Sequence, residues 1–484
     1  MATSIKTNYL LNLVNTIAGM VFPLITFPYS SRVLEADGIG IVNFYNSIIS
    51  YITLITCLGI PLYATREIAR VKCDPSQLSK RSAEILVLHV SLTIIGYIIV
   101  AILCFTVPKI RENWSIFLIL SASLIFNTMG CEWYFRGTED FKYITIRGLI
   151  TRIIYLPILF IFVRTKNDLL IFSFLTVFVT VGNNCFNFYK ISQILKLSEL
   201  KEAAKIPMKH LKGAVKIFLL SSSVIYIQLN ILLLGFLSTT TNVGYFTAAS
   251  RTTLISAGII TALQTTILPR NSFLLAQNNQ EGFKRTLTNS IDFILCFTLP
   301  MSTGLIIMAP LVIKLFAGDS YYPAITTLRF LSFSIIFSII NNFISTGILA
   351  PQGKEKIATY ACLIGVMVNL VLNFILVPVL AQNGTALSSI FTEMAVLIGM
   401  IIMGIKYIPI KLWKSSCNKY LISSILMFIF CFILWNLNSH ETYHLIVIPI
   451  AGFIFYPICL IILRDKFYLN IQKMILVKLK ISRN

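Results

Sequence analysis

Charged side chains are scarce in this sequence, and acidic ones are scarcer still. Only 12% of the 484 residues are charged, with 19 Asp and Glu against 40 Lys and Arg, whereas 56% are hydrophobic. Apolar runs of about twenty residues recur along the whole chain, which is the length that an α-helix needs to cross a bilayer. This composition excludes a water-soluble core and predicts an all-α, polytopic membrane protein.

Paired cysteines and histidine clusters are also lacking. The ten cysteines stand singly without redox or ligand spacing, so we interpret them as small apolar side chains. The stretch His440-Glu441-Thr442-Tyr443-His444 matches the zinc motif H-E-x-x-H. A catalytic zinc also needs a third ligand and a cleft, and His89 and His210 belong to other regions. We therefore interpret the match as accidental and expect no cofactor and no metal.

Long polar intervals are almost absent, and the exception divides the chain. Residues 190–216 hold seven lysines and two glutamates between apolar runs. Basic loops are retained on the cytoplasmic side of a membrane, which explains the charge of +21 better than binding to nucleic acid does. The predicted domains are 1–189, a six-helix bundle; 190–216, a basic cytoplasmic linker; 217–405, a second six-helix bundle; and 406–484, two additional helices with a basic cytoplasmic tail.

The apolar runs predict fourteen transmembrane helices. They lie near 8–31, 39–62, 84–107, 114–135, 144–163, 168–189, 217–237, 243–268, 288–311, 325–350, 357–380, 384–405, 419–437 and 443–463. An even number puts both termini on one side, and most Lys and Arg residues fall in segments on that side. The expected location is a cell inner (plasma) membrane with both termini cytoplasmic.

The two halves repeat each other at an offset of 204 residues. Gly40 and Gly244 each open the second span of a half, and Lys80-Arg81 and Lys284-Arg285 close the loop that follows. Internal repeats of this kind surround a central cavity in transporters. The pattern therefore favours a transporter over a membrane anchor.

Ionisable residues inside predicted spans include Glu132, Arg152, Arg251, Asp292 and Glu393. Each charge costs about 2.5–3.5 kcal/mol at mid-helix, so it needs a partner or a hydrated cavity. Structural ion pairs are one interpretation. A cavity whose arginines hold an anionic substrate is the other.

Polar stripes run along three spans at helical spacing. They comprise Asn8, Asn12 and Asn15; Asn43, Asn46, Ser47, Ser50 and Thr53; and Ser223, Gln228 and Asn230. Such side chains can hold helices together by hydrogen bonds, or they can line a hydrated path for sugar hydroxyls. The sequence leaves both interpretations open.

Four further stretches carry a resemblance to a known family. They are Phe27–Leu34 running to Gly38–Gly40, Tyr63–Ala69, Glu132–Ile144 and Val243–Ala249. The third is the most distinctive, because we find no generic packing reason for an acidic-aromatic cluster at the end of a span. With these residues the chain resembles the O-antigen and polysaccharide flippases of the multidrug/oligosaccharidyl-lipid/polysaccharide exporter (MOP) superfamily, over residues 8–405.

The resemblance implies a MATE-like fold, with two six-helix bundles in a V, here with two additional C-terminal helices. It implies alternating-access transfer of undecaprenyl-diphosphate-linked oligosaccharide, an O-antigen or capsule repeat unit, from the cytoplasmic to the outer leaflet, with no bond made or broken. Expected partners are the lipid-linked oligosaccharide, membrane lipids, a polysaccharide polymerase and a chain-length regulator. The expected driving force is H+, Na+ or the membrane potential.

Three groups of residues are candidates for this function. Those expected to bind the anionic headgroup are Arg32, Arg66, Arg152 and Arg251; to line the cavity, Asn12, Asn43, Asn46, Ser50, Ser223 and Asn230; and to couple transport to an ion, Glu132, Asp292 and Glu393. The chain departs from many relatives at Asn230, where they have aspartate, and at Arg251, where they have lysine. The first change weakens the case for carboxylate coupling there, and the second adds a planar fork suited to phosphate.

Alternative functions remain open. A lipid II flippase shares the fold and the lipid carrier, whereas a multidrug antiporter for organic cations would present carboxylates, not arginines, to its cavity. A membrane glycan polymerase or acyltransferase would need a catalytic constellation, and the short outer loops argue against the polymerase.

Overall fold

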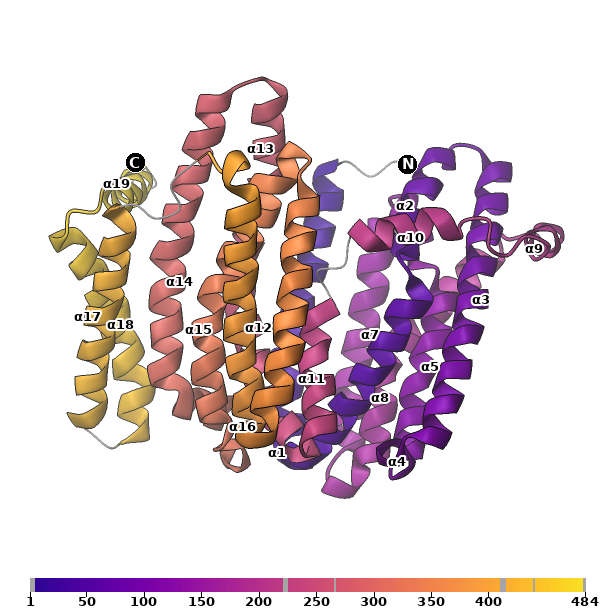
Figure 1. The fold of residues 1–484 in the computed structure, drawn as a ribbon, viewed down its shortest axis with the longest axis horizontal. Coiled ribbons are helices and arrows are strands. Elements are labelled where there is room, and N and C mark those ends of the chain that lie inside the picture. Colours follow the sequence, from indigo (N-terminus) through magenta and orange to yellow (C-terminus); the bar gives the residue numbers. More distant parts are fainter. Residues whose placement is uncertain (1–4, 221–224, 265–266, 410–414, 438–439, 482–484) are drawn as a thin grey trace. The chain divides into compact units, whose positions relative to one another are not determined.

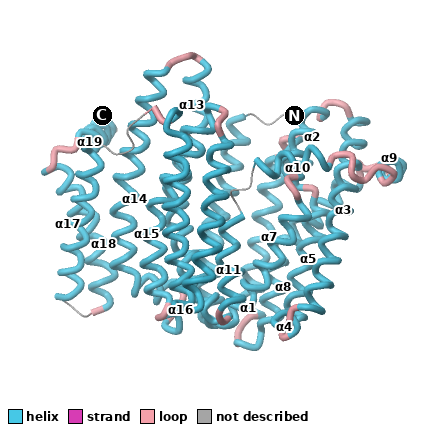
Figure 2. Tube along the Cα trace, viewed as in Figure 1, coloured by secondary structure: helices cyan, strands magenta, loops and turns pink. Residues whose placement is uncertain are grey.

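The computed structural model describes residues 5–220, 225–264, 267–409, 415–437 and 440–481. Within these ranges the backbone is helical apart from short turns, and no strand occurs (Figures 1 and 2). Among the described residues, 10 helices are long and apolar enough to cross a membrane. The chain is therefore an all-α, multi-pass membrane protein, as the composition predicts.

The chain divides into two compact units, Met1–Gly244 and Tyr245–Asn484. The first unit contains α1 (Ile5–Cys57), α2 (Ile60–Val71), α3 (Pro75–Thr106), α4 (Pro108–Arg111), α5 (Trp114–Gly130), α6 (Glu132–Gly137), α7 (Phe141–Phe162), η1 (Lys166–Asp168), α8 (Leu169–Ser192), α9 (Leu197–Ala203), α10 (Leu211–Leu220), α11 (Ile225–Leu237) and the start of α12 (Thr240–Gln264).

The second unit contains the rest of α12 and the elements that follow it. These are α13 (Ile267–Ala276), α14 (Gln280–Phe316), η3 (Asp319–Tyr321), α15 (Ala324–Asn342), the π-helical turn η4 (Phe343–Leu349), η5 (Ala350–Gln352), α16 (Glu355–Gly404), η6 (Ile405–Tyr407), α17 (Ser415–Leu437), α18 (Glu441–Ile462) and α19 (Lys466–Ile481). The two predicted C-terminal helices correspond to α17 and α18, and the tail begins with α19.

Two helices are too long for a single crossing. At about 1.5 Å per residue, α1 and α16 would each extend more than twice the ~30 Å thickness of a hydrocarbon core. Each contains a residue with a positive φ, Glu35 (φ 54°) in α1 and Ala381 (φ 47°) in α16, where the helix direction changes. Each therefore supplies two arms, and both bends lie where the sequence predicts loops between spans. The total of fourteen spans stays a prediction, because the predicted span 217–237 includes residues 221–224, which the structure does not describe.

The basic segment 190–216 packs against the first unit. Helix α9 packs on α3 and α10 packs on α2, so these elements gather at one end of the unit, and α4 lies at the other (Figure 1). We call the first the linker end and the second the far end. Buried His210 joins the segment to two helices, because its Nδ1 lies 2.8 Å from the Tyr63 hydroxyl and its Nε2 lies 2.9 Å from Glu84 Oε2. Both predicted linker boundaries fall within this unit.

At the far end, the second arm of α1 crosses the start of α12 at backbone contact. A Cβ atom on Gly40 would overlap the carbonyl group of Thr240, and one on Gly244 would overlap that of Ala36. Gly40 and Gly244 differ by 204 residues, and so do their partners Ala36 and Thr240. Corresponding positions of the two sequence repeats therefore meet each other in a nearly symmetrical crossing. The Thr240 hydroxyl also donates to Asp37 Oδ1 at 2.5 Å.

Lys109 fixes the end of α11 at the same end of the unit. Its amine donates to the carbonyl oxygens of Gly235 and, at 2.8 Å, Ser238. A cation at the C-terminus of a helix is favourable, because it complements the helix dipole and satisfies carbonyl groups that lack helical partners. Burial lowers the pKa of Lys109 from its usual value.

The crossing predicts a large difference between two glycine substitutions. Gly40→Ala places a methyl group against backbone that a rotamer change cannot move, so we expect a loss of about 1–3 kcal/mol in the free energy of unfolding. Gly304→Ala, in α14, is the control, because nothing lies within 4 Å of its added Cβ atom. Thermal unfolding of the detergent-purified protein measures both. Equal melting temperatures for the two variants would contradict the crossing.

Candidate functional site

The second arm of α1 has one polar and one apolar face. Asn43, Asn46, Ser50 and Thr53 are half-buried along one side of the helix, whereas Phe44, Tyr45, Ile48, Ile49 and Ile52 are buried in the core. The Ser50 hydroxyl donates to the Asn46 carbonyl oxygen at 2.7 Å, and the Asn43 amide donates to that of Ile39 at the same distance. Partly exposed polar groups on a membrane helix are better matched by a hydrated passage than by lipid.

Arg152 lies in the middle of α7, eleven residues from the start of the helix or about 16 Å along its axis. Its Nη1 lies 3.1 Å from Asn15 Oδ1 and 3.3 Å from the Asn15 carbonyl oxygen. Among the described residues no carboxylate lies within ion-pair distance of it. The next residue, Thr151, donates to Asn183 Oδ1 at 3.1 Å. The half-buried guanidinium is therefore held by the neutral amide and carbonyl oxygens of Asn15.

The other predicted arginines lie at different depths. Arg32 is exposed beside the bend of α1, and its Nη1 donates to the Pro28 carbonyl oxygen at 2.7 Å. Arg66 is exposed on α2 at the linker end, and half-buried Arg251 belongs to the second unit. The first unit therefore does not gather Arg32, Arg66 and Arg152 around one position. Their roles as headgroup ligands stay predictions.

The predicted coupling residues each have a nearby polar partner or a buried position. Glu393 is buried, and its Oε2 accepts from Asn341 Nδ2 at 2.7 Å. Asp292 is buried on α14.

Three of the predicted cavity-lining residues lie outside the polar face of α1. Asn230 on α11 is buried. Ser223 lies outside the described residues, as does the side chain of Asn12.

Arg147 is a buried charge that the sequence analysis missed. It lies on α7, donates to Asn187 Oδ1 on α8, and places Nη2 3.8 Å from Glu132 Oε2. Glu132 also accepts from Arg136 at 2.7 Å. The sequence carries a signal for it, because Arg147 lies inside the predicted span 144–163, but a basic residue three positions from the end of a span is also expected among those that flank the membrane.

The acidic-aromatic stretch from Glu132 to Ile144 has a packing role, contrary to the interpretation from sequence. Trp133, Tyr134 and Phe135 are buried where α6 packs on α2. Asp140 accepts a hydrogen bond from the backbone N–H of Tyr143 at the start of α7 and pairs with Lys190 of α8 at 2.8 Å. The stretch therefore ties four helix ends together, and the side chains of Trp133, Tyr134 and Phe135 are inaccessible to a ligand.

The H-E-x-x-H match lies at the start of α18. His444 is buried and stacks on Trp435 with 4.1 Å between ring centroids, and its Nε2 lies 3.1 Å from the Trp435 carbonyl oxygen. His440 is exposed. The described residues contain no group of three or more His, Cys, Asp or Glu side chains placed to hold a metal ion.

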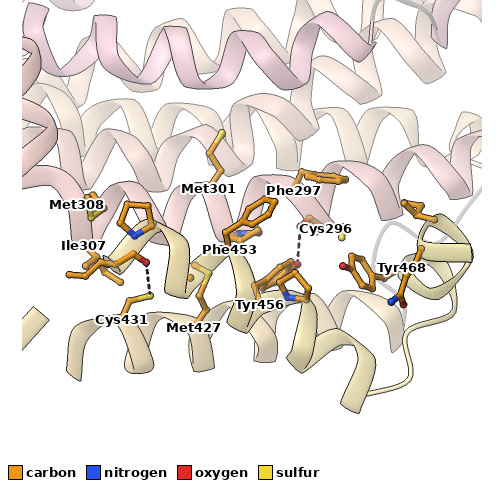
Figure 3. A pocket seen from close by; sticks show the side chains of 18 residues that line it. Cys296, Phe297, Met301, Ile307, Met308, Met427, Cys431, Phe453, Tyr456 and Tyr468 are labelled. Carbon is orange, nitrogen blue, oxygen red and sulfur yellow. Dashed lines mark hydrogen bonds between the residues drawn. The ribbon is translucent and has the colours of Figure 1, made fainter. Parts of the chain in front are cut away.

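An apolar pocket of about 540 Å³ lies in the second unit between α14, α17, α18 and α19 (Figure 3). Phe297, Met301, Met427 and Phe453 contribute to its wall, and Gly304 leaves one side of α14 open. Tyr456 on α18 closes one part by donating its hydroxyl to the Cys296 carbonyl oxygen at 2.8 Å. The volume falls within the range of about 300–1,000 Å³ typical of small-molecule sites. No pattern in the sequence distinguishes the residues of this pocket from lipid-facing ones.

Comparisons with known proteins give two family matches. Residues 5–275 match the family described as "Polysaccharide biosynthesis protein", and residues 150–453 match the one described as "Lipid II flippase MurJ". A protein of Shigella dysenteriae named "Putative O-antigen transporter" is 25% identical over 399 residues, or 82% of this chain and 99% of that protein. A protein of Escherichia coli K12 with the same name is 23% identical over 77% of this chain and 90% of its own length.

Solved structures share the fold. A lipid II flippase MurJ in an inward closed conformation matches with a TM-score of 0.70 and 17% identity, over 95% of this chain and 99% of the other. An inward-facing multidrug resistance MATE family transporter of the MOP superfamily matches with a TM-score of 0.56 and 14% identity, over 84% and 96%. At these identities the likeness concerns the fold alone.

The polar face of α1 predicts a pattern of chemical labelling. In a variant without the ten native cysteines, Asn46→Cys and Ser50→Cys should react with a charged methanethiosulfonate reagent, because water reaches a hydrated passage. Ser47→Cys is the matched control, because Ser47 is fully buried on the same helix. Mass spectrometry of labelled membranes measures the modification. Labelling of all three positions to the same extent, or of none, would contradict a hydrated face.

Proposed function

The chain belongs to the family of polysaccharide biosynthesis proteins, and from this premise we propose that it is a flippase for undecaprenyl-diphosphate-linked oligosaccharide. It moves an O-antigen or capsule repeat unit from the cytoplasmic to the outer leaflet of the inner membrane by alternating access, with both termini cytoplasmic. The names of the two bacterial relatives support this substrate class. The function is transport and involves no catalysis.

The observation that carries the proposal is the environment of Arg152. A guanidinium about halfway along a membrane helix is costly unless an anion accompanies it, and here its partner is the neutral Asn15. A phosphate of the lipid carrier supplies the missing negative charge. Guanidinium groups suit this role, because their planar fork donates two parallel hydrogen bonds to phosphate oxygens.

The polar face of α1 accommodates the glycan. Asn43, Asn46, Ser50 and Thr53 present amide and hydroxyl groups along about three turns of helix. These groups both donate and accept hydrogen bonds, as sugar hydroxyls do. The face therefore offers many interchangeable contacts, which suits a bulky substrate that has to pass through and leave.

The pocket between α14 and the C-terminal helices accommodates part of the polyprenyl chain. Its wall is formed mainly by apolar side chains, including Phe297, Met301, Met427 and Phe453. An isoprenoid chain has no hydrogen-bonding groups, so it gains affinity from this wall by dispersion and by release from solvent or lipid contacts. The headgroup and the tail would then be held by separate parts of the protein.

Lipid II is the second candidate substrate. The match of residues 150–453 to the lipid II flippase family favours it, and lipid II carries the same undecaprenyl diphosphate. Complementation of strains that each lack one flippase distinguishes the two. Restoration of O-antigen or capsule supports the first function, and rescue of peptidoglycan synthesis alone supports the second.

Transport requires a driving force and works beside other proteins. We propose H+, Na+ or the membrane potential as the source of energy, with Glu132, Asp292 and Glu393 as candidates for coupling. A polysaccharide polymerase and a chain-length regulator are the proposed partners, because they act on the flipped repeat unit.

Substitution of Arg152 tests the proposed phosphate contact. Arg152→Gln removes a charge-assisted hydrogen bond worth about 1.5–3 kcal/mol, so export should fall roughly tenfold or more, and Arg152→Lys should retain part of it. Arg70→Gln is the control, because this exposed arginine pairs with Glu67 on the surface of α2. Surface polysaccharide in a complemented deletion strain is the measurement. Export by Arg152→Gln equal to that by Arg70→Gln, at equal protein levels, would remove the proposed contact.

Filling the pocket tests the tail site. Gly304→Phe places a ring in the open space beside α14, so we expect weaker binding of undecaprenyl diphosphate, whereas Gly304→Ala should bind as the parent protein does. Fluorescence competition with the purified, detergent-solubilised protein gives both affinities. Unchanged binding by a folded Gly304→Phe variant would show that the tail lies elsewhere.

A further inference from the structure

Several buried hydrogen-bond donors in the first unit have no acceptor among the described residues, and two of them belong to side chains that contact each other. They are Nε of Arg147 on α7 and Nδ2 of Asn187 on α8; Trp133 Nε1 on α6 is a third at the linker end. The two side chains are joined by the bond from Arg147 Nη1 to Asn187 Oδ1, so the unsatisfied donors flank one contact. Buried donors are nearly always satisfied in folded proteins, so an acceptor from outside the chain is expected here.

The nearest carboxylate holds Arg147 only loosely. Glu132 Oε1 accepts from Arg136 Nε at 3.0 Å and from Arg136 Nη2 at 2.7 Å, whereas Glu132 Oε2 lies 3.8 Å from Arg147 Nη2. The separation of 3.8 Å between Glu132 and Arg147 exceeds the range of an N–H···O hydrogen bond. Glu132 therefore neutralises Arg147 through space while its hydrogen bonds go to Arg136.

The charges in this cluster do not balance. Lys190 and Asp140 pair with each other at 2.8 Å, and Glu132 is the single carboxylate that Arg136 and Arg147 share. The Arg147 side chain is 5% exposed and that of Glu132 is 41% exposed. The cluster therefore has an excess positive charge, and the buried Arg147 lies on the protein side of Glu132, whose carboxylate is accessible to solvent.

We propose that Arg147 and Asn187 form a binding site for a phosphate group, and that Glu132 stands in for this phosphate when the site is empty. An arriving phosphate takes Nε and Nη2 of Arg147 together with Nδ2 of Asn187. Glu132 then moves fully to Arg136 and is not left as an unpaired charge, which keeps the exchange inexpensive. This inference rests on the proposed function and assigns the first contact of the diphosphate to the linker end.

The site lies close to Arg152 along the same helix. Arg147 and Arg152 are five residues apart, or about 7.5 Å along the axis of α7. Arg147 faces α8 through Asn187, and Arg152 faces α1 through Asn15. The two arginines therefore offer phosphate positions at different depths and on different faces of α7.

The test compares two glutamate substitutions in the purified full-length protein, with inorganic pyrophosphate as the probe. Glu132→Gln removes the internal competitor, so pyrophosphate should bind roughly tenfold more tightly than to the parent protein. Glu139→Gln is the matched control, because Glu139 pairs with Lys72 at 3.1 Å at the same end of the unit and contacts neither arginine. Its affinity should equal that of the parent protein. Isothermal titration calorimetry measures all three.

Two further variants separate binding from folding. Arg147→Lys keeps the charge and loses the fork, and Asn187→Asp places a new competing carboxylate beside Arg147, so both should weaken binding at least fivefold. If either fails to fold, the comparison of Glu132→Gln with Glu139→Gln still decides. Equal affinities for those two variants, or absence of pyrophosphate binding by both, would overturn the site.

Complementation separates this failure from failure of the proposed function. If the parent protein restores surface glycan but the two glutamate variants bind pyrophosphate equally, only the Arg147 site is wrong. If the parent protein restores no glycan in any flippase-deficient strain, the proposed function itself is wrong.

Discussion

The cost of placing a guanidinium group inside a membrane is the constraint on which this account depends. Lipid supplies neither water nor counter-ions, so every buried arginine needs acceptors from the protein or from a ligand. The first unit meets this need incompletely. Arg152 has the neutral Asn15, and Arg147 shares Glu132 with Arg136. We propose that phosphate of the lipid carrier meets the rest of this need.

Different interactions stabilise the two ends of the first unit: close backbone packing at the far end and polar contacts at the linker end. At the far end, Gly40 and Gly244 allow backbone contact between α1 and α12, which leaves no room for side chains to adjust. At the linker end, ion pairs and the hydrogen bonds of His210 join the segment 190–216 to α2 and α3. Polar contacts exchange partners more readily than packed backbones do. The end that the sequence assigns to the cytoplasm is thus the one that polar contacts hold together.

Much of the fold could be predicted from sequence, because lipid demands long apolar helices and these are visible as composition. The bends at Glu35 and Ala381 lie in predicted loops, and the two C-terminal helices lie where their apolar runs do. The site was less predictable. Arg147 was missed because its depth follows from where α7 starts, which hydropathy defines poorly. Glu132 was recognised as unusual, but its partners come from α6 and α7 and follow only from the fold.

The aromatic stretch and the apolar pocket show a second limit of sequence. Trp133 and Phe135 are buried against α2. From the sequence alone, these aromatic residues could equally face lipid headgroups or a ligand. Met301 and Phe453 line a pocket although nothing distinguishes them from lipid-facing residues. Burial depends on which helices are neighbours, and periodicity within one helix does not reveal this.

A structure of the protein with bound undecaprenyl-diphosphate-linked oligosaccharide tests the central claim most directly. We predict phosphate oxygens within hydrogen-bond distance of Arg147 or Arg152 on α7, and a Glu132 carboxylate that has moved away from Arg147 toward Arg136 whenever Arg147 holds the phosphate. Phosphates bound away from α7, with the side-chain contacts of Arg147 and Arg152 the same as without substrate, would contradict this claim.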